Sequence, residues 1–96
     1  MSVTVQKDTL LIRADDCLAA DISKTETVIL GADRKNYYGT NEVSSRIWKL
    51  MEQETSPAAI TATLTQEYDV DESTCLDAVI KVLEDMAREN LVQVRA

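Results

Sequence analysis

The sequence contains no histidine, one proline, two glycines and no long apolar run among its 96 residues. Without histidine, the chain lacks the commonest general base, the Ser–His and Cys–His nucleophile pairs, and the ligand of most zinc sites. Its longest apolar stretches are three or four residues, whereas a membrane-spanning helix needs about 20. The N-terminus has no basic start followed by an apolar run, so we expect no secretory signal, no membrane partner and a cytoplasmic location.

Composition and charge narrow the class of protein further. Apolar residues make up 45% of the chain, which predicts one folded domain over residues 1–96. Ten basic residues against 17 acidic ones give a net charge of −7, and so acidic a surface repels phosphate, which disfavours nucleic acid as a partner. Cys17 and Cys75 lie 58 positions apart, and in a cytosolic chain we expect free thiols rather than a disulfide.

Residues 10–40 carry short apolar and β-branched segments of the kind that form strands. Tyr37–Tyr38 begins one of them, and its two rings point to opposite faces because side chains alternate along a strand. We expect an antiparallel meander of three strands with tight connections, and a short terminal strand. Besides Tyr37–Tyr38, the segments of strand type in this region are Leu10–Ile12, Cys17–Ile22 and Thr27–Leu30, and the predicted terminal strand is Val92–Val94.

Residues 41–90 show the apolar spacing of three helices. The first opens at Asn41 as its N-cap, and the second opens with Ser56–Pro57, where proline suits the first helical position. The apolar row of the first helix is Val43, Ile47, Leu50 and Met51, and that of the second is Ile60, Leu64 and Tyr68.

The third helix has well-marked ends and a broad apolar surface. Asp71 is its predicted N-cap, and Asn90 is predicted to take the left-handed position after the helix, with Leu91 folding back on Met86. This apolar face is wider than one core contact requires. It consists of Cys75, Leu76, Val79, Ile80, Val82, Leu83 and Met86.

The chain has few candidates for catalysis. It contains no G-x-G-x-x-G loop, no Walker loop and no C-x-x-C pair, so we expect no enzyme activity, no metal and no cofactor. The carboxylates at Asp15–Asp16 and around Asp71 are better explained as turn and cap residues than as a cation site. Cys75 lacks a histidine partner, which favours packing over reactivity. An acyl carrier is disfavoured because the nearest match to its Asp-Ser-Leu signature is Glu72-Ser73-Thr74.

Strands followed by three helices predict an α+β, winged-helix-like fold, a three-stranded antiparallel sheet followed by a three-helix bundle. A winged-helix-type DNA-binding or transcription-regulatory domain is therefore an alternative. However, residues 71–90 carry six acidic side chains against two basic ones, which disfavours entry into a phosphate-lined groove.

A peptide-binding groove between an unpaired sheet edge and the broad third helix is the other hypothesis. The extra apolar residues could equally complete the core, and the pattern leaves both open.

Seven segments together carry a family signature through their order and spacing: 28–33, 37–43, 47–50, 57–64, 67–71, 77–79 and 83–92. They resemble the signature of the PqqD-like family. The resemblance covers roughly residues 17–94, and a stand-alone domain with Tyr37-Tyr38-Gly39 followed by Asn41 is most similar to the small B1 proteins of lasso-peptide gene clusters. The chain departs from the family at Asn36, where glycine is usual, and at Thr40, where leucine is usual.

Members of this family are RiPP recognition elements, and the resemblance implies their function. They bind the leader segment of a ribosomally synthesised precursor peptide and present it to maturation enzymes. In lasso systems these are a B2-type cysteine-protease leader peptidase and then a cyclase. The leader adds as a fourth strand beside the third strand of the sheet, in the cleft against the third helix.

This mode of binding gives specific site predictions. We expect the backbone of Lys35, Asn36, Tyr37, Tyr38 and Gly39 to pair with the leader. Apolar anchors on the third helix would suit the Tyr and Pro that lasso leaders of this family often carry three residues apart. Leu76 and Leu83 could equally belong to the core, where we also expect Trp48. The predicted anchors are Leu76, Ile80 and Leu83, and the predicted rim residues are Asp77, Lys81 and Glu84.

Overall fold

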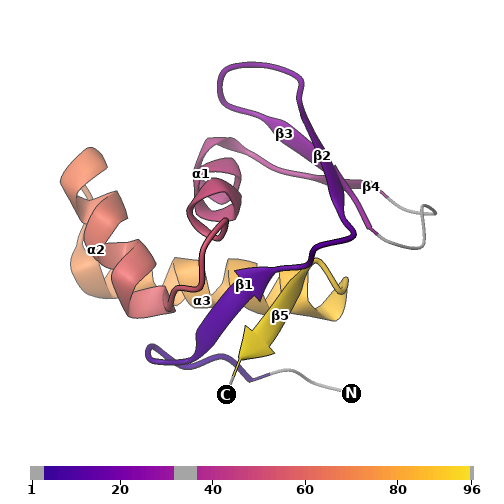
Figure 1. Cartoon of the computed structure of the whole chain (residues 1–96). Coiled ribbons are helices and arrows are strands. Elements are labelled where there is room, and N and C mark those ends of the chain that lie inside the picture. Colours follow the sequence, from indigo (N-terminus) through magenta and orange to yellow (C-terminus); the bar gives the residue numbers. More distant parts are fainter. Residues whose placement is uncertain (1–3, 32–36, 96) are drawn as a thin grey trace.

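The computed structural model describes residues 4–31 and 37–95 of the chain. They form an α+β fold in which strands precede three helices and a last strand follows them (Figure 1). The elements are β1 (Leu10–Arg13), β2 (Leu18–Asp21), β3 (Thr27–Leu30), β4 (Tyr37–Gly39), α1 (Glu42–Leu50), α2 (Pro57–Glu67), α3 (Glu72–Arg88) and β5 (Val92–Arg95).

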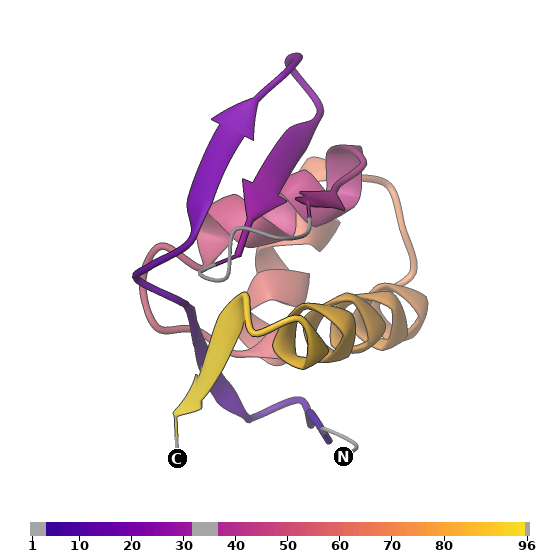
Figure 2. The same ribbon diagram turned by 90° about the vertical axis from the view of Figure 1, so that its right-hand side faces the viewer.

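The strands form two separate sheets. β2, β3 and β4 make a three-stranded antiparallel sheet in that order, which confirms the predicted meander and fold class. β1 does not join this meander. It pairs instead with β5 in an antiparallel ribbon, with Leu11 opposite Val94. β1 and β5, which lie near opposite ends of the sequence, are therefore side by side and away from the three-stranded sheet (Figures 1 and 2).

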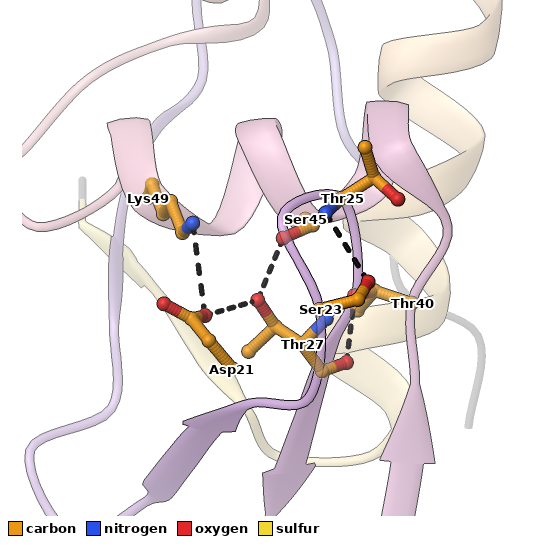
Figure 3. A network of polar contacts seen from close by, with 7 residues as sticks. All are labelled: Asp21, Ser23, Thr25, Thr27, Thr40, Ser45 and Lys49. Atoms are coloured by element: carbon orange, nitrogen blue, oxygen red, sulfur yellow. Dashed lines mark hydrogen bonds and ion pairs between the residues drawn. The ribbon is translucent and has the colours of Figure 1, made fainter.

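A buried polar network fastens the three-stranded sheet to α1 (Figure 3). The Thr27 hydroxyl donates to Asp21 Oδ1 at 2.8 Å and lies 2.6 Å from the Ser45 hydroxyl of α1. Thr40 Oγ1 donates to the Thr27 carbonyl at 2.7 Å and accepts from the Thr27 N–H at 3.0 Å. Thr40 therefore replaces the apolar contact of the family's leucine with two hydrogen bonds that fix the end of β4 to β3. Lys49 adds an ion pair to Asp21 at 3.6 Å.

Each helix begins at the predicted cap. Asn41 accepts from the Ser44 N–H, while Ser44 Oγ accepts from the Asn41 N–H, a reciprocal capping box. Ser56 caps α2 ahead of Pro57, and Asp71 caps α3.

The end of α3 also matches the prediction. Asn90 has a φ of 59°, and its N–H donates to the Ala87 carbonyl at 3.0 Å. The Leu91 N–H donates to the Met86 carbonyl at 2.9 Å, which together with the Asn90 bond completes a Schellman motif. Leu91 is thereby turned into the core, and the chain is directed into β5.

The core lies where the three helices meet β1, β3 and β5. Trp48 is 3% exposed and therefore a core residue, as expected, with the Arg13 guanidinium 5.3 Å from its ring centre. Cys17 is half-buried and Cys75 is buried, and both are free thiols. No helix among the described residues is long and apolar enough to cross a bilayer. The buried apolar residues include Leu11, Ile29, Ile47, Met51, Ile60, Leu64, Val79, Leu83, Met86 and Leu91.

Candidate functional site

β4 is an edge strand of the three-stranded sheet. Within the described residues it pairs with β3 on one side, and its other backbone edge has no strand partner. Tyr38 lies opposite Ile29 and packs half-buried against the core, whereas Tyr37 is 75% exposed. The two rings therefore point to opposite faces, as predicted. Lys35 and Asn36, which we expected to extend this edge, lie outside the described residues.

The backbone groups of β4 alternate between β3 and the free edge. The Thr40 N–H donates to the Thr27 carbonyl at 3.0 Å, so Thr40 points toward β3. Because successive residues of an antiparallel ladder point alternately toward and away from the partner strand, Tyr38 also points toward β3. The N–H and C=O groups of Tyr37 and Gly39 then point to the free edge, where they are available to another strand.

Tyr38 connects this edge to the C-terminal part of α3. Burial raises the pKa of Tyr38 above its usual value, the Glu89 carboxylate raises it further, and Arg88 acts in the opposite direction. These charges act on the phenol because the end of α3 lies near it. Figures 1 and 2 show β4 and this part of α3 on the same side of the molecule.

The two flanks of α3 have different surroundings. Successive helical residues are about 100° apart, so the buried row through Val79 and Leu83 separates two flanks. On one flank, Glu84 Oε2 accepts from the Val5 N–H at 3.0 Å. Leu76 on the same flank lines a hollow of about 390 Å³ together with Lys7, Asp8 and residues of α2. The N-terminal segment therefore lies beside this flank, below α3 in Figure 2.

The opposite flank of α3 faces β4. Glu89, whose charge acts on Tyr38, lies on it, and helical spacing places Ala78, Val82 and Asp85 on the same side. Val82 is half-buried against the core, and Ala78 is exposed. Asp85 forms an ion pair with Arg88. An apolar strip with an acidic end thus runs along α3 on the side of the free strand edge.

The structure divides the predicted site residues into groups. Tyr37, Tyr38 and Gly39 form the free strand edge. Leu83 is 0% exposed and belongs wholly to the core. Leu76, Ile80 and Glu84 lie on the flank toward the N-terminal segment, and Asp77 and Lys81 are exposed on the outer side of α3. Helical spacing places Ala78, Val82, Asp85 and Glu89 on the flank toward β4, and of these sequence analysis put only Val82 on the apolar face.

The reactive groups considered from the sequence have structural roles. Burial raises the pKa of Cys75, and burial followed by the Asp16 charge raises the pKa of Cys17, so neither thiol is activated. The Thr74 N–H and then the Ser73 hydroxyl lower the pKa of Asp71, which is the signature of a helix cap. Among the described residues, no three Cys, Asp or Glu side chains gather as metal ligands would.

Comparisons with known proteins agree with this geometry. The family described as coenzyme PQQ synthesis protein D (PqqD) matches residues 26–92, or 67 of the 96 residues. TbiB1, solved in complex with the TbiA(beta) leader peptide, is 30% identical with a TM-score of 0.79, and the match covers 88% of this chain and 98% of TbiB1.

A second solved structure shares the fold. It is the solution NMR structure of the PqqD truncation of Methylobacterium extorquens PqqCD, a stand-alone RiPP recognition element. It is 15% identical with a TM-score of 0.78, and the match covers 94% of this chain and 95% of that one. No curated protein sequence matches the chain. The matched family and the shared fold confirm the resemblance seen in the sequence, and the chain belongs to the PqqD family as a PqqD-like RiPP recognition element.

Proposed function

We propose that the chain binds the leader segment of a ribosomally synthesised precursor peptide as an added strand on β4. It then delivers the bound precursor to maturation enzymes, a leader peptidase and then a cyclase, in lasso-peptide or related RiPP biosynthesis. The observation that carries the proposal is the free backbone edge of β4 beside an apolar strip of α3. A relative of the same fold, TbiB1, is solved with a leader peptide. The chain itself has no catalytic part in the proposal.

The free edge supplies affinity with little demand on leader sequence. The outward N–H and C=O groups of Tyr37 and Gly39 are the pairing partners. The hydrogen bonds between Thr40 and Thr27 hold the end of β4 in extended form before the leader arrives. Binding then orders fewer residues, which lowers its entropic cost.

Side chains beside the edge supply specificity. Alternate leader residues on the inner side point between Tyr38 and the α3 strip of Ala78 and Val82, where apolar side chains are favoured. Asp85 and Glu89 at the end of that strip favour a basic leader residue, and the net charge of −7 favours its approach. The helical part of the site is thus assigned to the flank facing β4 rather than to Leu76, Ile80 and Glu84.

DNA binding is not favoured as an alternative. The six acidic side chains of residues 71–90 include Glu72, the only charged residue in the first turn of α3, and phosphate would be repelled along the helix.

A matched pair of substitutions tests strand addition. Tyr37→Ala and Tyr37→Pro both remove the exposed ring, but only proline also removes the outward N–H. Labelled leader peptide of the neighbouring precursor gene is titrated against each variant and followed by fluorescence anisotropy. We expect Tyr37→Pro to bind at least tenfold more weakly than Tyr37→Ala, with circular dichroism showing both folded. Equal affinities, or equal binding of the core peptide without its leader, would contradict the proposal.

A further inference from the structure

The three-stranded sheet has a second free edge at β2, the strand farthest from β4 (Figure 2). Within the described residues β2 pairs only with β3, and its four side chains are all exposed. The Ile22 N–H donates to the Glu26 carbonyl at 3.0 Å, so Ile22 points toward β3. By the alternation of an antiparallel ladder, the N–H and C=O groups of Ala19 and Asp21 then point away from β3, where they are available to another strand.

A hollow of about 440 Å³ lies beside this edge, between β2, the end of β1 and the end of α1. Its volume falls within the ~300–1,000 Å³ that is usual for ligand sites in proteins. Ala19 belongs both to the hollow and to the free edge, and its side chain lies opposite the buried Ile29 on the inner face of the sheet. A strand added to β2 would therefore direct alternate side chains toward the hollow.

One wall of the hollow contains a buried hydrogen-bond donor without an acceptor. Trp48 is 3% exposed and lines the hollow, and its indole N–H has no hydrogen-bond partner among the described residues. Buried polar groups are nearly always paired, because an unpaired buried donor costs free energy. The Arg13 guanidinium lies 5.3 Å from the centre of the indole ring and also lines the hollow. Two donors thus lie together, and one acceptor group can satisfy both.

The charges around the hollow favour a neutral ligand that can both accept and donate hydrogen bonds. Asp15 and Glu52 line the hollow together with Arg13, and none of the ion pairs between described residues involves any of the three. A carboxylate ligand would be repelled by Asp15 and Glu52, and an ammonium group would be repelled by Arg13. A carboxamide avoids both penalties, because its oxygen accepts from the indole and guanidinium N–H groups while its NH₂ group donates to a carboxylate. Asn and Gln are the side chains that carry this group.

We propose that the β2 edge and this hollow, together called the β2 site, bind a second extended peptide segment that carries an Asn or Gln side chain. The backbone of the segment pairs with the outward groups of Ala19 and Asp21, and its carboxamide enters the hollow beside Trp48 and Arg13. The β2 site lies across the sheet from β4, so the two edges can be occupied at the same time. The inference does not depend on leader binding at β4.

Trp48 reports on this site directly, because it is the only tryptophan of the chain. The probe is the blocked tripeptide acetyl-Val-Gln-Val-amide, whose valines favour an extended backbone, and its matched controls carry Glu or Leu at the centre. Each peptide is titrated into the isotope-labelled chain, and NMR follows the indole N–H of Trp48 and the amides of Ala19 and Asp21. We expect the Gln peptide to shift all three resonances saturably and to bind at least tenfold more tightly than either control. Equal binding of the Gln and Leu peptides would overturn the proposal. So would an indole resonance that no peptide moves, since the indole N–H would then pair with water alone.

Substitutions test the edge and the hollow separately. Ala19→Pro and Ala19→Val both enlarge the side chain, but only proline removes the outward N–H. We expect Ala19→Pro to bind the Gln peptide at least tenfold more weakly than Ala19→Val, with circular dichroism showing both folded. Arg13→Met keeps the apolar stem without the guanidinium, should bind at least fivefold more weakly than the parent chain, and serves if the proline variant does not fold. Unchanged affinity in Arg13→Met, or equal affinities of the two Ala19 variants, would contradict the β2 site.

Competition distinguishes the two edges of the sheet. Saturation with leader peptide should leave the affinity for the Gln peptide within twofold, and Ala19→Pro should leave leader affinity, measured by anisotropy, within twofold. Displacement of the Gln peptide by the leader would place both peptides at β4 and overturn the β2 site. Failure of the parent chain to bind leader would instead overturn the proposed function alone.

Discussion

The assignment of one flank of α3 to the leader can be tested with two residues on the same helix. Val82 and Ile80 are both β-branched and half-buried against the core, but Val82 faces β4 and Ile80 faces the N-terminal segment. Val82→Lys and Ile80→Lys therefore make the same chemical change on opposite flanks. In each, the lysine stem can cover apolar surface while its ammonium reaches water.

The expected effect on binding follows from the burial of Val82. Full burial of an exposed aliphatic side chain is worth about 1.5–3 kcal/mol, and Val82 is already half-buried in the free chain, so the leader contributes roughly half of that. We therefore expect Val82→Lys to weaken leader binding by about 0.8–1.5 kcal/mol, or roughly 4–12-fold. Ile80→Lys should lower the free energy of unfolding because Ile80 packs against the core, and it should leave leader affinity within twofold.

The assay is anisotropy of labelled leader, with urea unfolding of each variant to confirm that binding is measured on folded protein. If Ile80→Lys weakened leader binding as much as Val82→Lys, the leader would not lie on the flank that faces β4, and the assignment would be refuted.

Three further predictions concern the scaffold that holds the site. Thr40→Val should cost about 1–3 kcal/mol in urea unfolding, because it leaves the buried N–H of Thr27 without its acceptor. Asn90→Val should cost about 1–2 kcal/mol at a φ of 59°, whereas Asn90→Gly should not destabilise, and a Val variant as stable as the Gly variant would contradict the left-handed cap. The Thr74 N–H lowers the pKa of Asp71 below its ordinary 3.8, so the stabilisation is complete above that value and is lost as pH falls through the lower folded pKa. Asp71→Asn keeps a capping oxygen that does not titrate, so its melting temperature should fall less than that of the parent chain between pH 6 and pH 2. An unchanged dependence of the melting temperature on pH would show that protonation of Asp71 does not weaken the cap.

Local sequence signals predicted much of the fold. Asn41, Ser56 and Asp71 cap the three helices, and Asn90 closes the last one, because these positions depend on a few neighbouring residues. The partner of β1 could not be predicted in this way. A short apolar segment indicates a strand near Leu10, but pairing with the far end of the chain depends on the packing of all three helices between them.

The site was predictable in outline and less so in detail. The Tyr37–Gly39 edge follows from the order of strands and the family resemblance. Which flank of α3 faces this edge does not follow from the sequence, because apolar residues occur on both sides of the buried row, Ile80 on one and Val82 on the other. The Val5–Glu84 hydrogen bond on one flank and the Glu89 charge that acts on Tyr38 on the other distinguish them. Likewise, the apolar residues of β2 and β3 indicate strands, but they do not indicate that one face of the sheet has no described helix or strand packed on it.

Hydrogen exchange at the amides of β4 tests strand addition most directly. The Tyr38 N–H already points to β3, while the N–H groups of Tyr37 and Gly39 point to the free edge. On saturation with leader peptide, NMR-detected exchange should slow at least tenfold at Tyr37 and Gly39 and change little at Tyr38. Tight leader binding that leaves the Tyr37 and Gly39 amides exchanging as fast as in the free chain would contradict strand addition at β4.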